Sequence, residues 1–199
     1  MTNAEIAYSP TLSLEENVKI NFRSAHKEKS LAHTLQTRFH AVALAKKFGP
    51  DEHQASVAAL LHNIADLLSE ENYIDFAKDY DLAIYEAEYH SPELLNQRLS
   101  RIIAVESFNI TDKEVLNAIN FHTTLRKNAS QLDKLIFLAD KMSLDSLQTP
   151  PYMPEVLKYL ETSLDEAVEC YNNNLYNEKN TSSSLHPWFR EAWQEIKNA

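Results

Sequence analysis

The stretch ASVAALLHNIAD, residues 55–66, decides the fold of this chain. Asp51 precedes it as a helix cap, because an Asp side chain can accept hydrogen bonds from the free backbone N–H groups at a helix start. Apolar residues then recur at a spacing that puts them on one helix face: Val57, Leu60, Leu61, Ile64 and Leu68. The polar pair His62-Asn63 lies near the end of this helix. We therefore expect a buried third helix that carries a polar site.

Caps and breakers divide the rest of the chain into further helices. Ser13 and Glu16 form a capping box for a first helix that ends near residues 23–25. A second helix begins near Lys29 and ends at Gly49, with Pro50 behind it. The helices expected after the third one are Glu70 to Tyr80, a helix capped by Ser91-Pro92 that runs through Leu99 to Val105, a helix behind a Thr111–Glu114 capping box, and one opened by Ser130.

The C-terminal part predicts one long helix, a loop and a short helix. The long amphipathic helix follows Pro154 and carries one apolar face: Val156, Leu160, Leu164, Val168, Tyr171 and Leu175. The stretch NNNLYNEKNTSSS, residues 172–184, is rich in Asn and Ser and indicates a loop or a fraying tail. Residues 187–199 form the last expected helix, whose Trp188 and Trp193 we expect to pack back on the domain.

The composition favours an all-α protein. Of the 199 residues, 44% are hydrophobic and only Gly49 is a glycine. A β-rich protein needs many turn residues at positive φ, and glycine supplies most of them. We therefore expect a helical bundle with a long C-terminal helix and a short terminal helix. Its expected parts are an N-terminal helical extension (1–28), a central domain (29–150) and C-terminal helices that pack on it (151–199).

Charge and segment composition exclude several functional classes. The net charge of −10 argues against a protein that binds nucleic-acid backbones or anionic membranes through clustered cations. Cys170 is the only cysteine, so thiolate metal clusters and intrachain disulfides are excluded. No signal peptide and no apolar run near the ~18 residues of a membrane span is visible. These features predict a cytoplasmic protein with no membrane partner.

Four separate segments bring chemically capable residues to helices with apolar faces. The residues are His33, the His62-Asn63 pair, His122 and Asp140. Helical bundles build metal sites in this way, by aiming side chains inward from facing helices. Imidazole and carboxylate ligands suit mid-row divalent metals.

The chain resembles the HD-domain metal-dependent phosphohydrolases, and within them the bacterial YqeK-type hydrolases of symmetrical dinucleoside tetraphosphates. Four blocks carry the resemblance in order and spacing: HTLQTRFHAVALAKKFG, ASVAALLHNIAD, ITDKEVLNAINFHT and LDKLIFLAD. It runs from about Lys29 to Ser146. The resemblance implies an HD-domain bundle that binds a divalent metal such as iron or manganese through His33, His62, Asn63 and Asp140, with His122 and Asp140 serving catalysis.

The same resemblance exposes two departures at the metal ligands. Asn63 stands where the family has the Asp of the His-Asp doublet, and Asn96 stands where it has a further histidine. A neutral amide is a weak ligand and cannot bridge two cations. Of the second metal's ligands only His122 clearly remains, so a site with one metal, or none, is expected.

The phosphate-binding positions depart as well. Ser30 replaces a family Arg, with Lys29 beside it, and Asp66 replaces a Lys that commonly follows the doublet. After Asp140, residues 143–146 read SLDS where the family has Glu-Pro-x-Arg. Each lost cation removes charge-assisted hydrogen bonds to phosphate. Weakened or lost family activity is therefore expected.

Several residues are better explained without a role at the site. Asp66 shares a helix face with His62 and is a candidate replacement ligand, but a solvated acid is the favoured interpretation. His90 is a second candidate substitute, with a surface position favoured. The others are expected at the surface, at boundaries or in loops, or, for the cysteine, as a small core residue: His26, His40, His53, His186 and Cys170.

Three functional hypotheses follow. The first is a mononuclear phosphohydrolase for a nucleotide or a smaller phosphate ester, in which His122 orients the substrate or shuttles a proton. The second is a non-catalytic HD-like binding or regulatory protein. The third is a structural relic, in which the imidazoles and the carboxylate satisfy one another without metal.

Overall fold

The computed structural model describes residues 6–179 and 185–198, and these residues are helical without any strand. The first eight α-helices in chain order are α1 (Leu14–Ser24), α2 (Glu28–Phe48), α3 (Glu52–Leu61), α4 (Tyr73–Asp79), α5 (Glu86–His90), α6 (Asn96–Glu106), α7 (Lys113–Asn120) and α8 (Gln131–Met142). The C-terminal helices are α9 (Met153–Leu160), α10 (Leu164–Lys179) and α11 (Pro187–Lys197). Three 3-10 turns join them: η1 (Ile64–Leu67), η2 (Glu70–Asn72) and η3 (Pro92–Leu95). The prediction of an all-α fold is confirmed.

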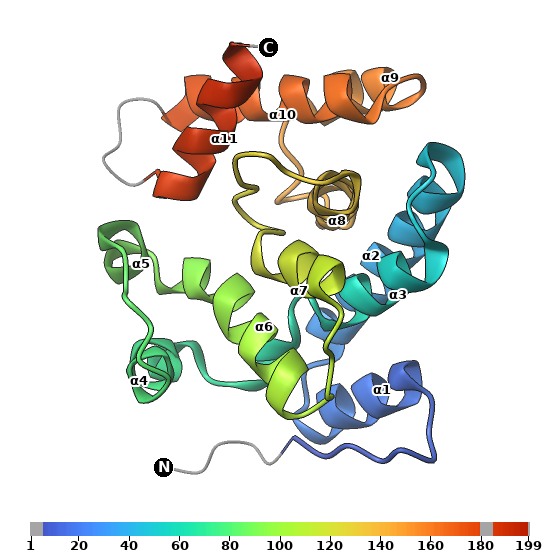
Figure 1. The fold of residues 1–199 in the computed structure, drawn as a ribbon, viewed down its shortest axis with the longest axis vertical. Helices are drawn as coiled ribbons and strands as arrows, with labels where there is room; N and C mark the ends of the chain where they lie inside the picture. Colours follow the sequence, from blue (N-terminus) through green and yellow to red (C-terminus); the bar gives the residue numbers. More distant parts are fainter. Residues whose placement is uncertain (1–5, 180–184, 199) are drawn as a thin grey trace.

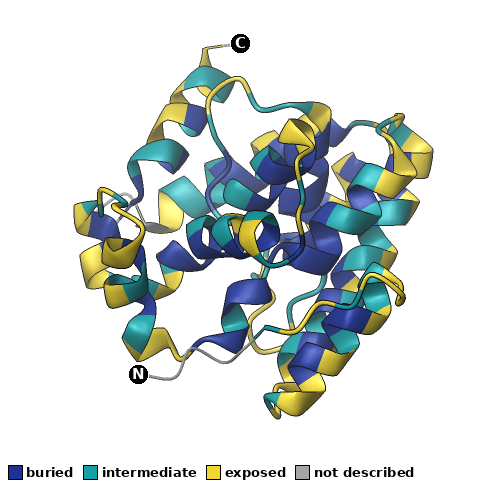
Figure 2. Cartoon of the chain, turned by 60° about the horizontal axis from the view of Figure 1, so that its bottom comes forward, coloured by how far each residue is buried: buried dark blue, intermediate teal, exposed yellow. Residues whose placement is uncertain are grey.

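Helix α2 forms the spine of the bundle. It packs against α3 and α8, while α7 packs against α3, α6 and α8. In Figure 1, α9–α11 lie at one end of the molecule beyond α8, and α1 lies at the opposite end. The central helices are the most buried ones (Figure 2). Their core includes Phe22, Leu61, Ile64, Phe137 and Leu138, all of them inaccessible to solvent.

The caps explain where the first helices begin and end. Ser13 and Glu16 form the expected capping box of α1, and the Asp51 carboxylate accepts from the Gln54 backbone N–H at 2.7 Å to start α3. Gly49 ends α2 with φ +100°, a left-handed conformation that strains residues with a side chain. Ser130 and Asp133 form a second capping box, which starts α8. These element starts were predicted correctly.

Helix α3 is shorter than its apolar pattern indicates. It ends at Leu61, and the chain continues through His62 and Asn63 into the 3-10 turn η1. Ile64 remains fully buried because the tighter turn still directs it into the core. The break therefore places the His62-Asn63 pair at a helix end, where their backbone leaves the regular helix.

Three other expectations at helix boundaries need correction. Asp112, rather than Thr111, caps α7 by accepting from the Glu114 and Val115 N–H groups. Ser91 does stand at the N-cap position with Pro92 behind it, but its side chain makes no capping hydrogen bond, and the segment begins as the 3-10 turn η3 before it continues as α6. The long C-terminal helix is two helices, because the Ser163 hydroxyl accepts from the Glu166 N–H and starts α10 anew.

The expected loop at residues 172–184 is mostly helix. Helix α10 extends to Lys179, and the remaining residues 180–184 lie outside the described part of the chain. The tryptophans of α11 do pack back as predicted. Trp193 stacks on Tyr176 with ring centroids 3.5 Å apart, and Trp188 packs edge-on against Phe121 at 4.7 Å. Aromatic packing of this kind stabilises the C-terminal helix on the bundle.

Among the described residues, no helix combines the length and the apolar character that crossing a membrane requires.

Candidate metal centre

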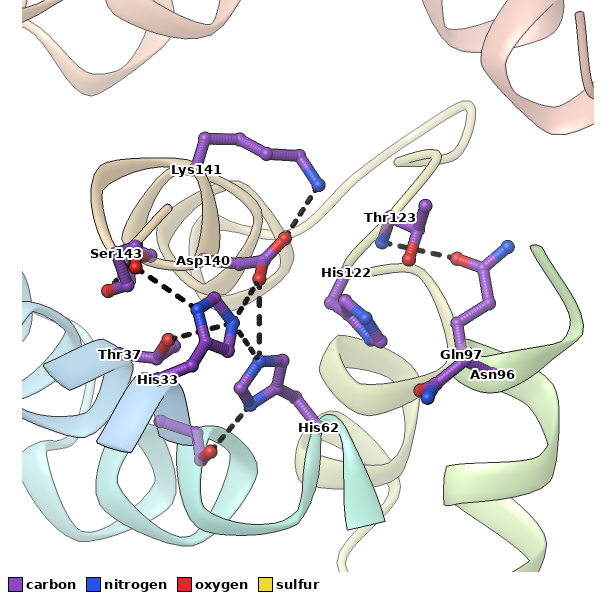
Figure 3. A network of polar contacts seen from close by, with 12 residues as sticks. His33, Thr37, His62, Asn96, Gln97, His122, Thr123, Asp140, Lys141 and Ser143 are labelled. Carbon is purple, nitrogen blue, oxygen red and sulfur yellow. Dashed lines mark hydrogen bonds and ion pairs between the residues drawn. The ribbon is translucent and has the colours of Figure 1, made fainter. Parts of the chain in front are cut away.

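Three helices bring two imidazoles and one carboxylate together in what we call the Asp140 cluster: His33, His62 and Asp140. His33 lies on α2, His62 ends α3, and Asp140 lies in the last turns of α8 (Figure 3). Asp140 Oδ1 is 2.9 Å from His33 Nε2 and 3.4 Å from His62 Nε2. The two Nε2 atoms are 3.2 Å apart. All ligand atoms of the cluster lie within 4.8 Å of one another.

Backbone carbonyls fix the orientation of both rings. His33 Nδ1 lies 3.1 Å from the Ser143 carbonyl oxygen, and His62 Nδ1 lies 2.7 Å from that of Ala59. A carbonyl oxygen only accepts hydrogen bonds, so each Nδ1–H must donate. The neutral form of each ring therefore presents its Nε2 lone pair to Asp140. Two lone pairs and an anionic oxygen that converge on one point need a shared proton or a cation between them.

Charges around the cluster keep Asp140 ionised. Burial alone raises the pKa of its carboxyl, but the Lys141 ammonium and the hydrogen bonds with His33 and His62 hold that pKa well below its usual range. Lys141 Nζ donates to Asp140 Oδ2 at 2.6 Å. Burial alone lowers the pKa of His33, but the hydrogen bond and the charge of Asp140 raise it overall. The cluster therefore holds an ionised carboxylate, paired with Lys141, beside two imidazoles.

His122 lies next to the Asp140 cluster but outside it. Its ring packs edge-on against His62 with centroids 4.9 Å apart. Its Nδ1–H donates to the Ile119 carbonyl at 2.8 Å, which leaves the Nε2 lone pair free to accept. Burial, and after it the neighbouring His62, lowers the pKa of His122 to about 3. His122 is consequently a neutral acceptor at neutral pH.

Gln97, which the sequence did not single out, holds the loop that carries His122. Its Oε1 accepts from the backbone N–H of Thr123 at 3.2 Å (Figure 3). It also accepts from the backbone N–H of Thr124 at 3.3 Å and from the Thr124 hydroxyl at 3.2 Å. Gln97 lies on α6 and is fully buried. Its position directly after Asn96, a residue that departs from the family, was the signal that could have identified it.

Asn96 belongs to a hydrogen-bond network instead of a second metal site. Its Nδ2 donates to Asp66 Oδ1 at 2.6 Å and to the Tyr73 hydroxyl at 3.2 Å, while Ser100 donates to its Oδ1 at 3.0 Å. Ser100 also accepts from the Ala65 N–H, which ties the network to η1. An amide at this position is therefore fully engaged by the protein.

The Asp140 cluster opens onto a cleft of about 820 Å³. Its lining comes from α2, the α3–η1 junction and the segment after α8: Lys29, Ser30, Ala32, His33, Gln36, Asn63, Asp66, Asp140, Ser143, Leu144, Asp145 and Gln148. The volume lies within the range of small-molecule sites. Asn63 and Asp66 thus face the same space as His33 and Asp140. Ligation by Asn63 stays a prediction.

The remaining histidines lie away from the cluster. His90 is exposed on α5, 3.8 Å from Glu86, and His26 and His53 are exposed as well. His40 is half-buried on α2 within 3.0 Å of Gln36. Cys170 is partly buried, and burial raises the pKa of its thiol, which disfavours the reactive thiolate.

His186 was expected at the surface or in a loop, and this expectation was wrong, because the residue is buried in a second cluster. This Glu88 cluster consists of Glu88, Arg98 and His186. Arg98 donates to the two Glu88 oxygens at 2.8 and 3.1 Å, and His186 Nε2 lies 3.4 Å from Glu88. His186 also caps α11 through its Nδ1. The partners are 98 residues apart in sequence, so no local pattern indicates this burial.

The donors of the Asp140 cluster fit a divalent metal ion. Two neutral imidazole nitrogens and one carboxylate oxygen are ligands that zinc, iron and manganese accept, and catalytic sites commonly use three protein ligands with an open position. Both rings are held by the outer hydrogen bonds that orient ligands in metal sites. The adjoining cleft leaves room for water and substrate.

Comparison with known proteins identifies relatives of the chain. Residues 30–145 match the HD domain family. An uncharacterized protein in the pepC 5′ region of Lactococcus lactis subsp. cremoris is 34% identical over 145 residues, 73% of each chain. The symmetrical bis(5′-nucleosyl)-tetraphosphatase of Halalkalibacterium halodurans is 32% identical over 136 residues, 68% of this chain and 71% of that protein.

A solved structure shares the whole architecture. A predicted HD superfamily hydrolase involved in NAD metabolism, from Clostridium acetobutylicum, superimposes with a TM-score of 0.83 at 27% sequence identity. The match covers 92% of this chain and 96% of the other. With more than half of its residues matched by the family, this chain belongs to the HD domain family and resembles the symmetrical bis(5′-nucleosyl)-tetraphosphatases within it.

Proposed function

We propose that this protein is a mononuclear metal-dependent phosphohydrolase that acts on a nucleotide or a smaller phosphate ester. The observation that carries the proposal is the convergence of the His33 and His62 Nε2 lone pairs on ionised Asp140, at the wall of a cleft. His33, His62 and Asp140 would hold the ion, and Asn63 would add its amide oxygen. When bound, such an ion would lower the pKa of a water and neutralise phosphoryl oxygens.

The protein's own residues would orient the reactants. His122 is neutral and buried against His62, outside the cleft lining. Its Nε2 lone pair can accept a hydrogen bond from a water beside the ion, and we assign it orientation of that water rather than proton storage. Lys141 balances the charge of Asp140 from the side of Oδ2. Lys29 is the cation that the cleft lining offers to a phosphate.

Activity on dinucleoside tetraphosphates should be weaker than in the relatives that bear that name. Asn63 and Asn96 remove anionic and imidazole ligands, which supports a single ion. One ion neutralises less of a polyphosphate than a pair, and the phosphate-binding cations expected from the family are replaced. The same departures support a second candidate, a non-catalytic HD-like binding protein, since the Lys141–Asp140 pair already satisfies the carboxylate without metal.

Turnover by metal-loaded protein separates the two candidates. We expect the wild type to release phosphate from nucleotides in the presence of manganese or iron. His62→Ala and Asp140→Ala should each lower this activity by at least about 100-fold, because each removes a direct metal ligand, and even the loss of a residue that only orients a ligand costs about 10- to 100-fold. The matched control is His90→Ala, which removes an exposed histidine outside the cleft and should retain activity. Equal turnover by all three variants, or none by the wild type, would contradict the enzyme proposal.

A further inference from the structure

The cleft beside the Asp140 cluster carries an unusual charge for a polyphosphate site. Its lining includes three carboxylates, from Asp66, Asp140 and Asp145, against one ammonium, from Lys29. Lys141 adds a second ammonium behind Asp140. One divalent cation would therefore leave the described lining with a single net positive charge. A phosphomonoester carries about 1.5 to 2 negative charges, whereas each added phosphate brings about one more.

Asp66 is held in place rather than free to move away from a bound phosphate. Asn96 Nδ2 donates to its Oδ1 at 2.6 Å, and Asn96 is itself fixed by Tyr73 and Ser100. Tyr73 in turn donates to the Ala65 carbonyl at 3.1 Å, next to Asp66 in η1. Moving the Asp66 carboxylate would break a network in which Asn96 is only 8% exposed. Its charge is therefore a fixed part of the cleft wall.

The rest of the lining suits a neutral, hydroxyl-bearing group. Ser30, Gln36, Asn63 and Gln148 present hydroxyl and amide groups that donate and accept hydrogen bonds, and the Ser143 hydroxyl, which donates to the Ala139 carbonyl, can still accept. Such groups recognise the hydroxyls of a sugar without adding charge. The cleft thus offers one electropositive position, at the metal ligands, and an otherwise neutral to acidic wall.

We propose that Asp66, fixed by Asn96, is a specificity determinant that selects phosphomonoesters with a hydroxyl-rich group over polyphosphates. This inference rests on the proposed function, since it describes the substrate class of the same site. A phosphate at the Asp140 cluster meets the metal and Lys29. Further phosphates along the chain of a polyphosphate meet the Asp66 carboxylate in a partly buried wall, where repulsion between like charges is weakly screened.

The test compares adenosine 5′-monophosphate with diadenosine tetraphosphate on the full-length, manganese-loaded protein. The wild type should give the higher kcat/KM with the monophosphate. Asp66→Asn keeps the shape of the side chain and an oxygen that can accept from Asn96, but removes the charge. This variant should shift the ratio of the two kcat/KM values toward the tetraphosphate by about tenfold or more, and added salt should reduce the shift.

The matched control is Asp75→Asn on α4, which changes the net charge of the protein by the same amount at a side chain that is 65% exposed. It should leave the ratio unchanged. A wild type that prefers the tetraphosphate, or equal ratios in wild type and Asp66→Asn, would overturn the inference.

Equilibrium binding separates this inference from the proposed function. If the wild type hydrolyses neither compound, the proposed function fails, but calorimetric titration with the same two probes still tests selection. Tighter binding of the monophosphate, with the tetraphosphate gaining about tenfold in affinity in Asp66→Asn, supports the inference. Equal affinities of the wild type and Asp66→Asn for the tetraphosphate would refute the inference.

Discussion

The Asp140 cluster and the Glu88 cluster both hold a carboxylate against imidazole inside the bundle, but their surroundings differ. Glu88 accepts from Arg98, from the Tyr85 backbone N–H at 2.8 Å and from His186, so its charge is balanced by the protein. Lys141 balances Asp140 at Oδ2, but Asp140 Oδ1 faces two imidazole lone pairs beside a cleft. A buried histidine–carboxylate contact is therefore insufficient to indicate a metal site.

The two clusters also join different parts of the molecule. The Glu88 cluster joins α5 and α6 to the start of α11, with Tyr85 and Trp188 packed around His186 at 4.9 and 4.8 Å. The Asp140 cluster joins α2, α3 and α8 in the centre of the bundle. The first should matter for stability and the second for binding and chemistry. The following predictions test that division.

Arg98→Ala should give the largest effect on stability. It leaves the Glu88 charge buried with much of its compensation gone, and losing one partner of a buried pair costs about 3 to 5 kcal/mol. Chemical denaturation should report this loss in the free energy of unfolding. The matched control is Arg101→Ala, an exposed arginine of the same helix, whose effect should stay within about 0.5 kcal/mol.

The loss of stability in Arg98→Ala should not be accompanied by a loss of affinity for metal. Arg98→Ala, measured under conditions where it is folded, should bind manganese as the wild type does. A parallel loss of metal binding would contradict the separation of the two clusters.

Asn63→Asp should change the affinity for manganese at the Asp140 cluster, with an effect smaller than the loss of stability in Arg98→Ala. A carboxylate in place of the amide adds a charged ligand at the cleft wall, so manganese affinity should rise by about tenfold, which corresponds to about 1.4 kcal/mol. Isothermal titration of wild type and variant measures this change. Unchanged affinity would mean that residue 63 does not reach the ion, and the assignment of Asn63 as a ligand would be withdrawn.

Low pH should reduce the contribution of the Glu88 cluster to the free energy of unfolding, and comparison with the uncharged variant Glu88→Gln should show this reduction. Burial alone raises the pKa of the Glu88 carboxyl, but His186, the Tyr85 N–H and Arg98 lower it overall, below the ordinary value of 4.5. A depressed folded-state pKa contributes stability above the unfolded-state value, and this contribution is lost as the pH falls through the folded-state pKa.

The measurement compares the unfolding free energy of the wild type with that of Glu88→Gln as the pH is lowered. The difference between them should stay constant above about pH 5 and shrink at lower pH. A difference that does not change down to pH 3 would show that Glu88 is not stabilised in its ionised form.

Local sequence patterns predicted the parts of this molecule that depend on local interactions. The caps at Ser13, Asp51 and Ser130 and the stop at Gly49 all follow from hydrogen bonds or φ preferences within one turn. The order and spacing of the family blocks indicated the residues that the fold brings together at Asp140.

The features that could not be predicted from the sequence depend mainly on contacts between residues far apart in the chain. The burial of His186 depends on Glu88, and the fixed position of Asp66 depends on Asn96, 30 residues away. The division of the C-terminal helix depends on whether Ser163 caps a new helix or continues the old one, and an apolar stripe is compatible with both. The role of Gln97 requires the loop after α7 to lie against α6.

The metal content of the purified protein tests the central claim most directly. After growth and refilling with manganese or iron, elemental analysis should find about one tightly bound ion per chain in the wild type and none in Asp140→Asn. Added metal should also raise the thermal unfolding temperature of the wild type alone. Two ions per chain, no bound ion, or equal content in the two proteins would contradict a mononuclear site at His33, His62 and Asp140.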